Sequence, residues 1–163
     1  MNKILSEMRD YFGEDERRVE HAGKVLYYAG RILKKENANP DVVIPAAILH
    51  DIGIKECERK YLSTNGQLQE KEGPPIARKI LEKLKIKPEI IKEVCEIIAS
   101  HHSKGEINTL NFKVLWDADW LVNLRDEYDI KDTKRLKRII DKVFLTEEGK
   151  RIAGLIYLRS RKR

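Results

Sequence analysis

The chain has 163 residues, of which 41% are hydrophobic and 37% are charged, and its formal net charge is +6. A chain of this length matches one ordinary domain and buries enough surface to fold without a disulfide or a structural metal ion. No stretch approaches the roughly 18 consecutive apolar residues of a membrane-spanning helix, and the N-terminus lacks the apolar core of a signal peptide. We therefore expect no membrane partner and a cytoplasmic location.

The cysteines and the C-terminal tail indicate little specific chemistry. Cys57 and Cys95 form no CxxC pair, and we expect both thiols to be reduced in the cytoplasm. The last residues, RSRKR, carry four positive charges. We interpret this tail as a solvated terminus, although such a segment could also contact nucleic-acid phosphates.

Almost every segment has the periodicity of an amphipathic helix. In chain order, the patterns predict helices over residues 2–12, 14–36, 41–53, 74–85, 88–102 and 110–125, and two more within 132–160. Residues 54–72 and 103–109 are polar and predict loops. Strand patterns, repeats and linkers are absent from the sequence, so we expect one all-α domain over 1–163, a bundle of about six to eight helices.

Five polar residues fall on the apolar faces of these predicted helices. They are His21, His50, Asp51, His102 and Asp119. One inward histidine is usually a satisfied core residue, and an inward aspartate usually pairs with a cation, so a buried ion network is one interpretation. Buried carboxylates are costly unless they are paired or coordinated, and a bound divalent cation would compensate both aspartates and accept neutral imidazoles as ligands. We therefore predict a metal site.

The donor set indicates the kind of ion. Adjacent residues on a helix point about 100° apart, so His50 and Asp51 can flank a metal ion in a wide, octahedral site. Two imidazoles and two carboxylates, with no cysteine among them, favour Mn, Fe, Co or Mg over a thiolate zinc site.

The order of these residues resembles the H…HD…D pattern of the HD-domain metal-dependent phosphohydrolases. His21 lies in VEHAGKVLYYA, the pair His50–Asp51 in AAILHDIG and Asp119 in DADWL, and the resemblance spans about residues 18–125. It implies an all-α HD-domain fold, one or two divalent metal ions, and hydrolysis of a phosphate ester or anhydride, usually in a nucleotide. By the family's pattern these four residues are metal ligands.

The resemblance also implies particular roles for individual residues. Asp51 would position the attacking water or bridge two metal ions. Asp117 competes with Asp119 as the ligand in DAD, and we prefer Asp119 because related members keep an Ala-Asp step before the apolar pair.

Relatives that bind two metal ions use two further histidines. His102, followed by serine, matches one of them and has His101 beside it. Glu72 in EGPPIARKIL stands where the other histidine would be, so a full dinuclear centre stays open. We predict a catalytic or metal-binding role for Glu72.

A metal-activated water would attack the phosphoryl group, and nearby cations would offset the charge that develops on its oxygens. Arg18, Lys55 and Lys104 are candidates for this role, and each could instead be a solvated surface cation. We expect a small phosphorylated substrate, with specificity set by residues 54–72 and 103–109, and the helices at 132–160 could pack on a second copy. Two alternatives are a non-catalytic HD module that senses a nucleotide or a metal, and an RNA-associated protein.

Overall fold

A computed structural model describes residues 1–103, 105, 107–128 and 132–159. The helices in chain order are α1 (Asn2–Phe12), α2 (Glu16–Leu33), α3 (Pro40–Leu49), α4 (Ile54–Tyr61), α5 (Gly66–Lys83), α6 (Pro88–Ile98), α7 (Leu110–Glu127), α8 (Thr133–Val143) and α9 (Glu147–Gly154), followed by the π-helical segment η1 (Leu155–Arg159). No strand occurs within these described ranges, and the predicted all-α bundle is confirmed.

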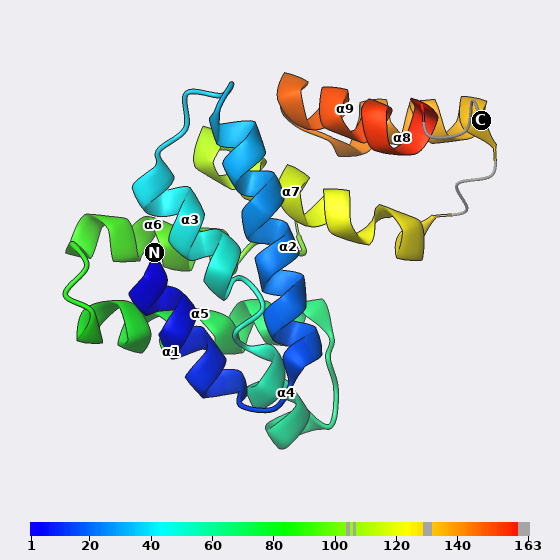
Figure 1. The fold of residues 1–163 in the computed structure, drawn as a ribbon. Helices are drawn as coiled ribbons and strands as arrows, with labels where there is room; N and C mark the ends of the chain where they lie inside the picture. Colours follow the sequence, from blue (N-terminus) through cyan, green and yellow to red (C-terminus); the bar gives the residue numbers. More distant parts are fainter. Residues whose placement is uncertain (104, 106, 129–131, 160–163) are drawn as a thin grey trace.

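The centre of the bundle is formed by α2, α3 and α7 (Figure 1). α2 packs along α7 on one side and along α3 on the other, while α6 lies against both α3 and α5. α3 is surrounded by these neighbours, and Val42, Val43 and Leu49 are completely buried in it. A helix that is apolar on all sides is stable only at such a central position. The end of α3 therefore carries the residues that follow it, His50 and Asp51, into the interior.

Several predicted helix boundaries were wrong. The helix predicted over 41–53 ends at Leu49, so His50 and Asp51 follow it in a turn. Residues 54–72 are not a loop: they contain α4 and the first turns of α5. α5 begins at Gly66, where the Asn65 side chain accepts a hydrogen bond from the backbone N–H of Gln67 at 2.9 Å, and not at the prolines eight residues later. α6 ends at Ile98 and does not reach the histidines at 101 and 102.

The C-terminal helices pack at one end of α7 (Figure 1). The indole N–H of Trp116 donates to the Val143 carbonyl at 3.0 Å, and the Tyr157 hydroxyl donates to the Leu121 carbonyl at 2.6 Å. The predicted pair of helices over 132–160 is observed as α8 and α9, extended by η1. Thr146 caps α9, accepting from the N–H of Gly149 at 2.9 Å.

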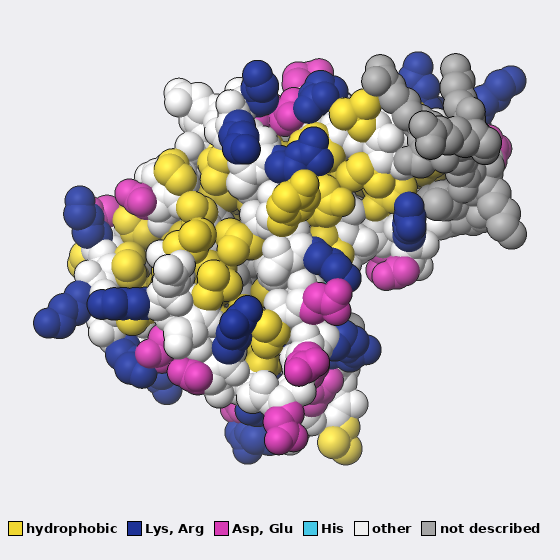
Figure 2. Space-filling view, viewed as in Figure 1, with side chains coloured by type: hydrophobic (Ala, Val, Ile, Leu, Met, Phe, Trp, Pro, Cys, Tyr) yellow, Lys and Arg dark blue, Asp and Glu magenta, His cyan; other side chains and the backbone are white. Residues whose placement is uncertain are grey.

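The surface is densely charged, as the composition predicts. Figure 2 shows Lys, Arg, Asp and Glu side chains around a central area of apolar side chains on the face drawn in Figure 1. Among the described helices, none has the length and apolar character needed to span a bilayer.

Candidate metal centre

The pair His50–Asp51 lies in the turn that connects α3 to α4. This turn packs closely on α5: a Cβ added at Gly53 would lie 2.7 Å from the backbone nitrogen of Gly73. Only a glycine permits so close an approach of two backbones. Gly53 thus allows the turn to pack directly on α5, and this packing positions His50 and Asp51 in the interior.

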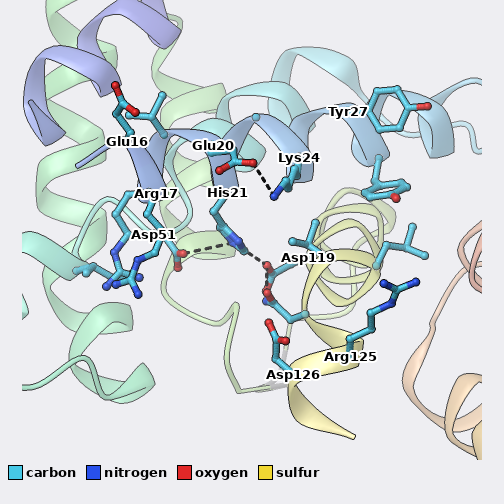
Figure 3. Close-up of a pocket in the computed structure, with 18 of the residues that line it drawn as sticks. Glu16, Arg17, Glu20, His21, Lys24, Tyr27, Asp51, Asp119, Arg125 and Asp126 are labelled. Atoms are coloured by element: carbon cyan, nitrogen blue, oxygen red, sulfur yellow. Dashed lines mark hydrogen bonds and ion pairs between the residues drawn. The ribbon is translucent and has the colours of Figure 1, made fainter. Parts of the chain in front are cut away.

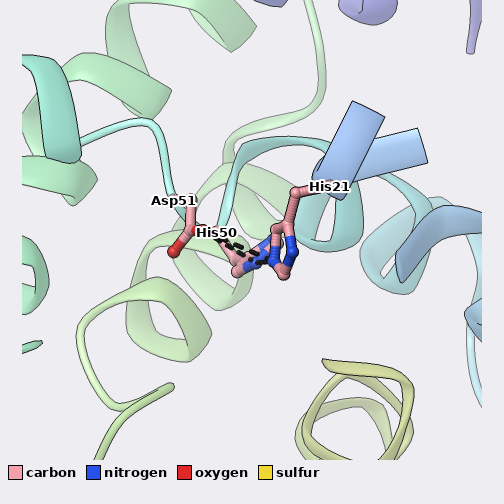
Figure 4. A group of neighbouring side chains, drawn as sticks. All are labelled: His21, His50 and Asp51. Carbon is pink, nitrogen blue, oxygen red and sulfur yellow. Dashed lines mark hydrogen bonds and ion pairs between the residues drawn. The ribbon is translucent and has the colours of Figure 1, made fainter. Parts of the chain in front are cut away.

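The first group of side chains joins the N-terminal half of the chain to α7. His21 Nε2 lies 3.2 Å from His50 Nε2, 3.5 Å from Asp51 Oδ2 and 3.2 Å from Asp119 Oδ1 (Figures 3 and 4). His50 Nε2 in turn lies 3.5 Å from Asp51 Oδ2 and 3.6 Å from Asp119 Oδ1. Two imidazole nitrogens and two carboxylate oxygens, which the sequence pattern had grouped, therefore converge on one point.

A second group shares Asp51 with the first. The candidate ligand atoms of Asp51, His101 and His102 lie within 4.8 Å of one another. His101 Nε2 is 3.4 Å from Asp51 Oδ1, whereas the other oxygen, Oδ2, faces His21 and His50. One carboxylate thus presents one oxygen to each group, so Asp51 could contribute a ligand atom to an ion in either group.

Hydrogen bonds to backbone carbonyls fix the tautomers of the two buried histidines. The Nδ1 of His50 lies 3.0 Å from the Ala47 carbonyl oxygen, and the Nδ1 of His101 lies 2.7 Å from the Ile98 carbonyl oxygen. A carbonyl can only accept, so each Nδ1 carries a proton and donates it. When the ring is neutral, each Nε2 then presents its lone pair to the centre, as in metal-ligating histidines whose other ring nitrogen is held by a backbone carbonyl.

The negative charges of the two carboxylates at this centre favour the binding of a cation. Burial would raise the pKa of Asp51 and of Asp119, but the surrounding histidines outweigh burial and hold both values well below the usual range. Burial lowers the pKa of His50, yet these two aspartates raise it to about 9. Desolvation of its ring and the neighbouring His101 lower the pKa of His102 to about 4. The carboxylates are therefore ionised, and the positive charge beside them in the ion-free protein is a proton on His50.

These residues fit a divalent cation by two criteria. An ion about 2.1 Å from each ligand atom places neighbouring ligands about 3.0 to 3.4 Å apart, close to the separations in the first group. The Nε2 of His101 is buried and has no hydrogen-bond partner within the described structure. A buried nitrogen left without a partner costs free energy that a metal ion would recover.

Two further residues that the sequence had singled out lie elsewhere. Glu72 belongs to neither group: its carboxylate accepts from the Lys60 ammonium at 2.7 Å and from the Tyr61 hydroxyl at 2.8 Å, and so it ties α4 to α5. Lys55 donates to the Tyr11 carbonyl at 2.7 Å. Lys104, the third predicted phosphate-binding cation, lies outside the described residues.

The two aspartates of DAD have different partners. Asp119 faces the histidines, and the Asn123 side chain donates to its Oδ1 at 2.8 Å. Asp117 points the other way and accepts from the backbone N–H of Leu145 at 2.7 Å and from the N–H and hydroxyl of Thr146 at 2.8 and 2.7 Å. Asp117 thus holds the start of α9, and Asp119 is the member of the pair that the fold brings to the centre.

His101 is the residue that the sequence analysis underrated. Its side chain is buried against Asp51 and lies in the second group, together with the predicted His102. His102 is exposed, and its ring packs on Gly66, where an added Cβ would lie 2.7 Å from the ring. The sequence did indicate His101, because it directly precedes the predicted ligand His102.

The centre opens into a cleft of about 1400 Å³. His21, Asp51, His102 and Asp119 line it, and Arg18 lines it on α2, one turn before His21. The predicted phosphate-binding residue Arg18 therefore shares the cleft with the candidate ligands.

An all-α bundle in which a histidine of an early helix, a His-Asp pair and a late aspartate converge is the arrangement of an HD domain. The family model of the HD domain matches residues 18–144, and the chain belongs to this family. HD domains generally bind divalent metal ions, and the two groups described above could hold them.

Among solved structures, the chain is similar to a predicted HD superfamily hydrolase from an uncultured Thermotogales bacterium, known from a crystal structure at 1.45 Å resolution. The two share 24% sequence identity with a TM-score of 0.73, over 98% of this chain and 86% of that chain. At this identity the likeness shows the fold. No curated protein matches the sequence.

Proposed function

We propose that this protein is a metal-dependent phosphohydrolase that cleaves a phosphate ester or anhydride of a nucleotide or a similar small phosphorylated metabolite. The observation that carries the proposal is the sharing of Asp51 between two groups of metal-binding side chains at the wall of an open cleft. Membership of the HD family supports metal-dependent hydrolysis in general. The oxygen and nitrogen donors favour Mn, Fe, Co or Mg.

Divalent ions held by these residues would lower the pKa of a bound water and polarise a phosphoryl oxygen. The protein's own residues provide the geometry. Asp51 offers one oxygen to each group, and the Ala47 carbonyl and the Asn123 amide fix the orientations of His50 and Asp119. Such supporting hydrogen bonds keep the ligands ready for the ion.

Arg18 supplies positive charge at the phosphoryl oxygens. Its side chain lies in the wall of the cleft, one turn before His21. A guanidinium binds phosphate oxygens through two parallel hydrogen bonds, and it offsets the negative charge that builds up as the phosphoryl group is attacked.

The test is a metal analysis followed by an activity assay. Protein purified without added metal is analysed for bound ions and then incubated with nucleotides, dinucleotides and sugar phosphates in the presence of Mn²⁺, Co²⁺, Fe²⁺ or Mg²⁺. Asp51→Asn should lower the release of phosphate or nucleotide by at least about 100-fold with unchanged helicity, because a neutral amide cannot bridge two cations.

Asp141→Asn, which removes a negative charge from an exposed position on α8, serves as the matched control and should be fully active. Undiminished turnover in Asp51→Asn would refute the proposal. Stoichiometric metal and nucleotide binding without any hydrolysis would favour the non-catalytic sensor instead.

A further inference from the structure

The cleft extends beyond the metal centre in both directions along α2. Arg17, His21, Lys24 and Tyr28 follow one another at helical spacings of four, three and four residues, and all line the cleft. With a rise of about 1.5 Å per residue, Arg17 lies about 6 Å before His21 along the helix axis and Tyr28 about 10 Å after it. Figure 3 shows Arg17 on one side of His21 and Asp51, and Tyr27 and Arg125 on the other.

The two ends of the cleft differ in charge. The end before His21, which we call the arginine arm, is lined by Arg9, Arg17 and Arg18 and by the acidic residues Glu16 and Glu20. Glu20 is paired with Lys24, and Arg18 has Glu58 and Asp15 beside it, so Arg9 and Arg17 against Glu16 leave an excess of one positive charge there. This excess lies beside the two carboxylates of the metal centre and would attract an anionic group bound next to it.

The other end, which we call the aromatic arm, has no such excess. Charged side chains of both signs line it, and its aromatic members are Tyr27, Tyr28 and Tyr157. Lys24 is paired with Glu20 at 2.8 Å. The guanidinium of Arg125 lies over the ring of Tyr157, 5.7 Å from its centroid. Tyr27 exposes 61% of its surface, whereas Tyr157 exposes 4%, and the guanidinium of Arg31 lies 5.9 Å from the centroid of the Tyr27 ring. An exposed aromatic ring such as that of Tyr27 is a platform on which a planar ring can stack.

The arginines of the arginine arm keep unused binding capacity. Arg18 contacts Glu58 at 3.3 Å and Asp15 at 3.7 Å, and its Nε has no hydrogen-bond partner within the described structure. These contacts are longer than the roughly 2.7–2.9 Å of a strong charge-assisted hydrogen bond.

Other arginines of this chain do reach such distances. Arg59, for example, binds Glu56 with two hydrogen bonds of 2.7 and 2.8 Å. Arg17 is exposed and makes no ion pair with any described residue. Arg17 and Arg18 can therefore bind a ligand without first breaking a strong internal pair.

We propose that the arginine arm binds a second phosphate group of the substrate, while the aromatic arm takes its planar ring. The inference rests on the proposed function and names its substrate class: a nucleoside di- or triphosphate, with the phosphate attached to the sugar at the metal centre beside Arg18 and the next phosphate on Arg9 and Arg17. The metal centre lies between the two arms along α2. The planar ring of the nucleotide, its first phosphate and its second phosphate would therefore lie in that order along the cleft.

This order determines which bond breaks. The oxygen of a water molecule forms a bond to the phosphorus nearest the sugar, and the bond from that phosphorus to the bridging oxygen breaks. The released phosphate keeps the bridging oxygen, and the two protons of the water are distributed between the products and solvent. A nucleoside diphosphate thus yields a nucleoside monophosphate and inorganic phosphate.

The experiment compares adenosine monophosphate and adenosine diphosphate as substrates of the metal-loaded protein, with the reaction run in ¹⁸O-labelled water. Wild-type protein should have a kcat/KM at least about tenfold higher for the diphosphate, and the label should enter the nucleoside monophosphate. Arg17→Ala should lower kcat/KM about tenfold for the diphosphate and less than about twofold for the monophosphate, because a charge-assisted hydrogen bond to the second phosphate is lost.

Arg78→Ala, which removes an exposed arginine of α5 outside the cleft, is the matched control and should leave both values unchanged. Arg9→Ala repeats the test if Arg17→Ala loses helicity. Label in the inorganic phosphate, or equal losses for both substrates in Arg17→Ala, overturns this inference and leaves the proposed function standing. A protein that hydrolyses neither these nor any other phosphorylated compound overturns both.

Discussion

His101 and His102 are neighbours in the chain, but the fold holds them to different degrees. His101 is 5% exposed, and its Nδ1–H donates to the Ile98 carbonyl. His102 is exposed, with its Nε2 3.2 Å from the Gln69 side-chain oxygen. A ligand whose orientation is fixed before the ion arrives binds it more tightly, because less conformational freedom is lost on binding.

We therefore expect His101→Ala to impair the second group more than His102→Ala does. The bound metal of a dialysed sample, measured by elemental analysis, should fall from about two ions per chain to about one in His101→Ala. His102→Ala should still bind the second ion, but only when the total metal concentration is higher than the wild-type protein needs. Retention of both ions by His101→Ala would contradict the assignment of His101 as a ligand.

The same residues show what a periodic pattern can predict. His21 and Asp119 lie within regular helices and His50 directly follows one, so the 3.6-residue period correctly indicated which of them face inward. His101 and His102 follow the end of α6 at Ile98. Beyond the end of a helix that period no longer predicts direction, and the exposed neighbour was preferred to the buried one.

At the scale of elements, α7 uses two aspartates, two residues apart, for different purposes. Asp117 accepts three hydrogen bonds from residues 145 and 146, whereas Asp119 faces the histidines. The first aspartate therefore anchors the C-terminal helices to the bundle, and the second is available to a metal ion.

We predict opposite phenotypes for the two alanine substitutions. Asp117→Ala leaves buried N–H groups without an acceptor and should lower the free energy of unfolding by about 2 to 5 kcal/mol while the folded protein still binds metal. Asp119→Ala should lower metal affinity at least about tenfold with a smaller loss of stability. Thermal unfolding and metal titration of both variants measure the two effects, and similar profiles for the two variants would contradict this division of roles.

The turn after α3 provides a second prediction at this scale. Gly53→Ala would place a methyl group against the backbone of Gly73 and should destabilise the fold by about 1 to 3 kcal/mol, because the helices must separate. Gly30→Ala on α2 is the matched control: nothing lies within 4 Å of its added Cβ, and it should stabilise the helix by about 0.5 to 1 kcal/mol. Chemical denaturation measures both, and equal effects would argue against the close approach at Gly53.

Helix positions were predictable where the pattern was strong and local. Residues 2–12 and 110–125 were predicted closely, because apolar faces and capping residues define those helices. α4 was missed, because Ile54 and Cys57 are its buried residues and the rest of its sequence is polar. The start of α5 was misplaced because Pro74 and Pro75 normally mark a first turn. Here they lie within the helix, where the burial of Gly73 and Ala77 holds them.

At the scale of the whole molecule, the metal centre joins segments that are distant in sequence. Its candidate ligands come from α2, the turn after α3, the turn after α6, and α7. The apolar core is extensive without the centre, so the helices should form in the absence of ions. An ion held by four segments, however, binds the folded chain and not the unfolded one, and it stabilises the fold in proportion to its occupancy.

Removal of the ions with a chelator should therefore lower the melting temperature without abolishing helicity. At a free metal concentration about 100 times the Kd, binding adds about 2.7 kcal/mol, which for a chain of this size corresponds to a shift of about 5 to 10 °C. Circular dichroism melts with and without chelator, at several Mn²⁺ concentrations, measure the shift. Asp51→Asn, which weakens both groups at once, should melt at the same temperature in either condition. An equal response of this variant and the wild-type protein to chelator would place the stabilising ion elsewhere in the molecule.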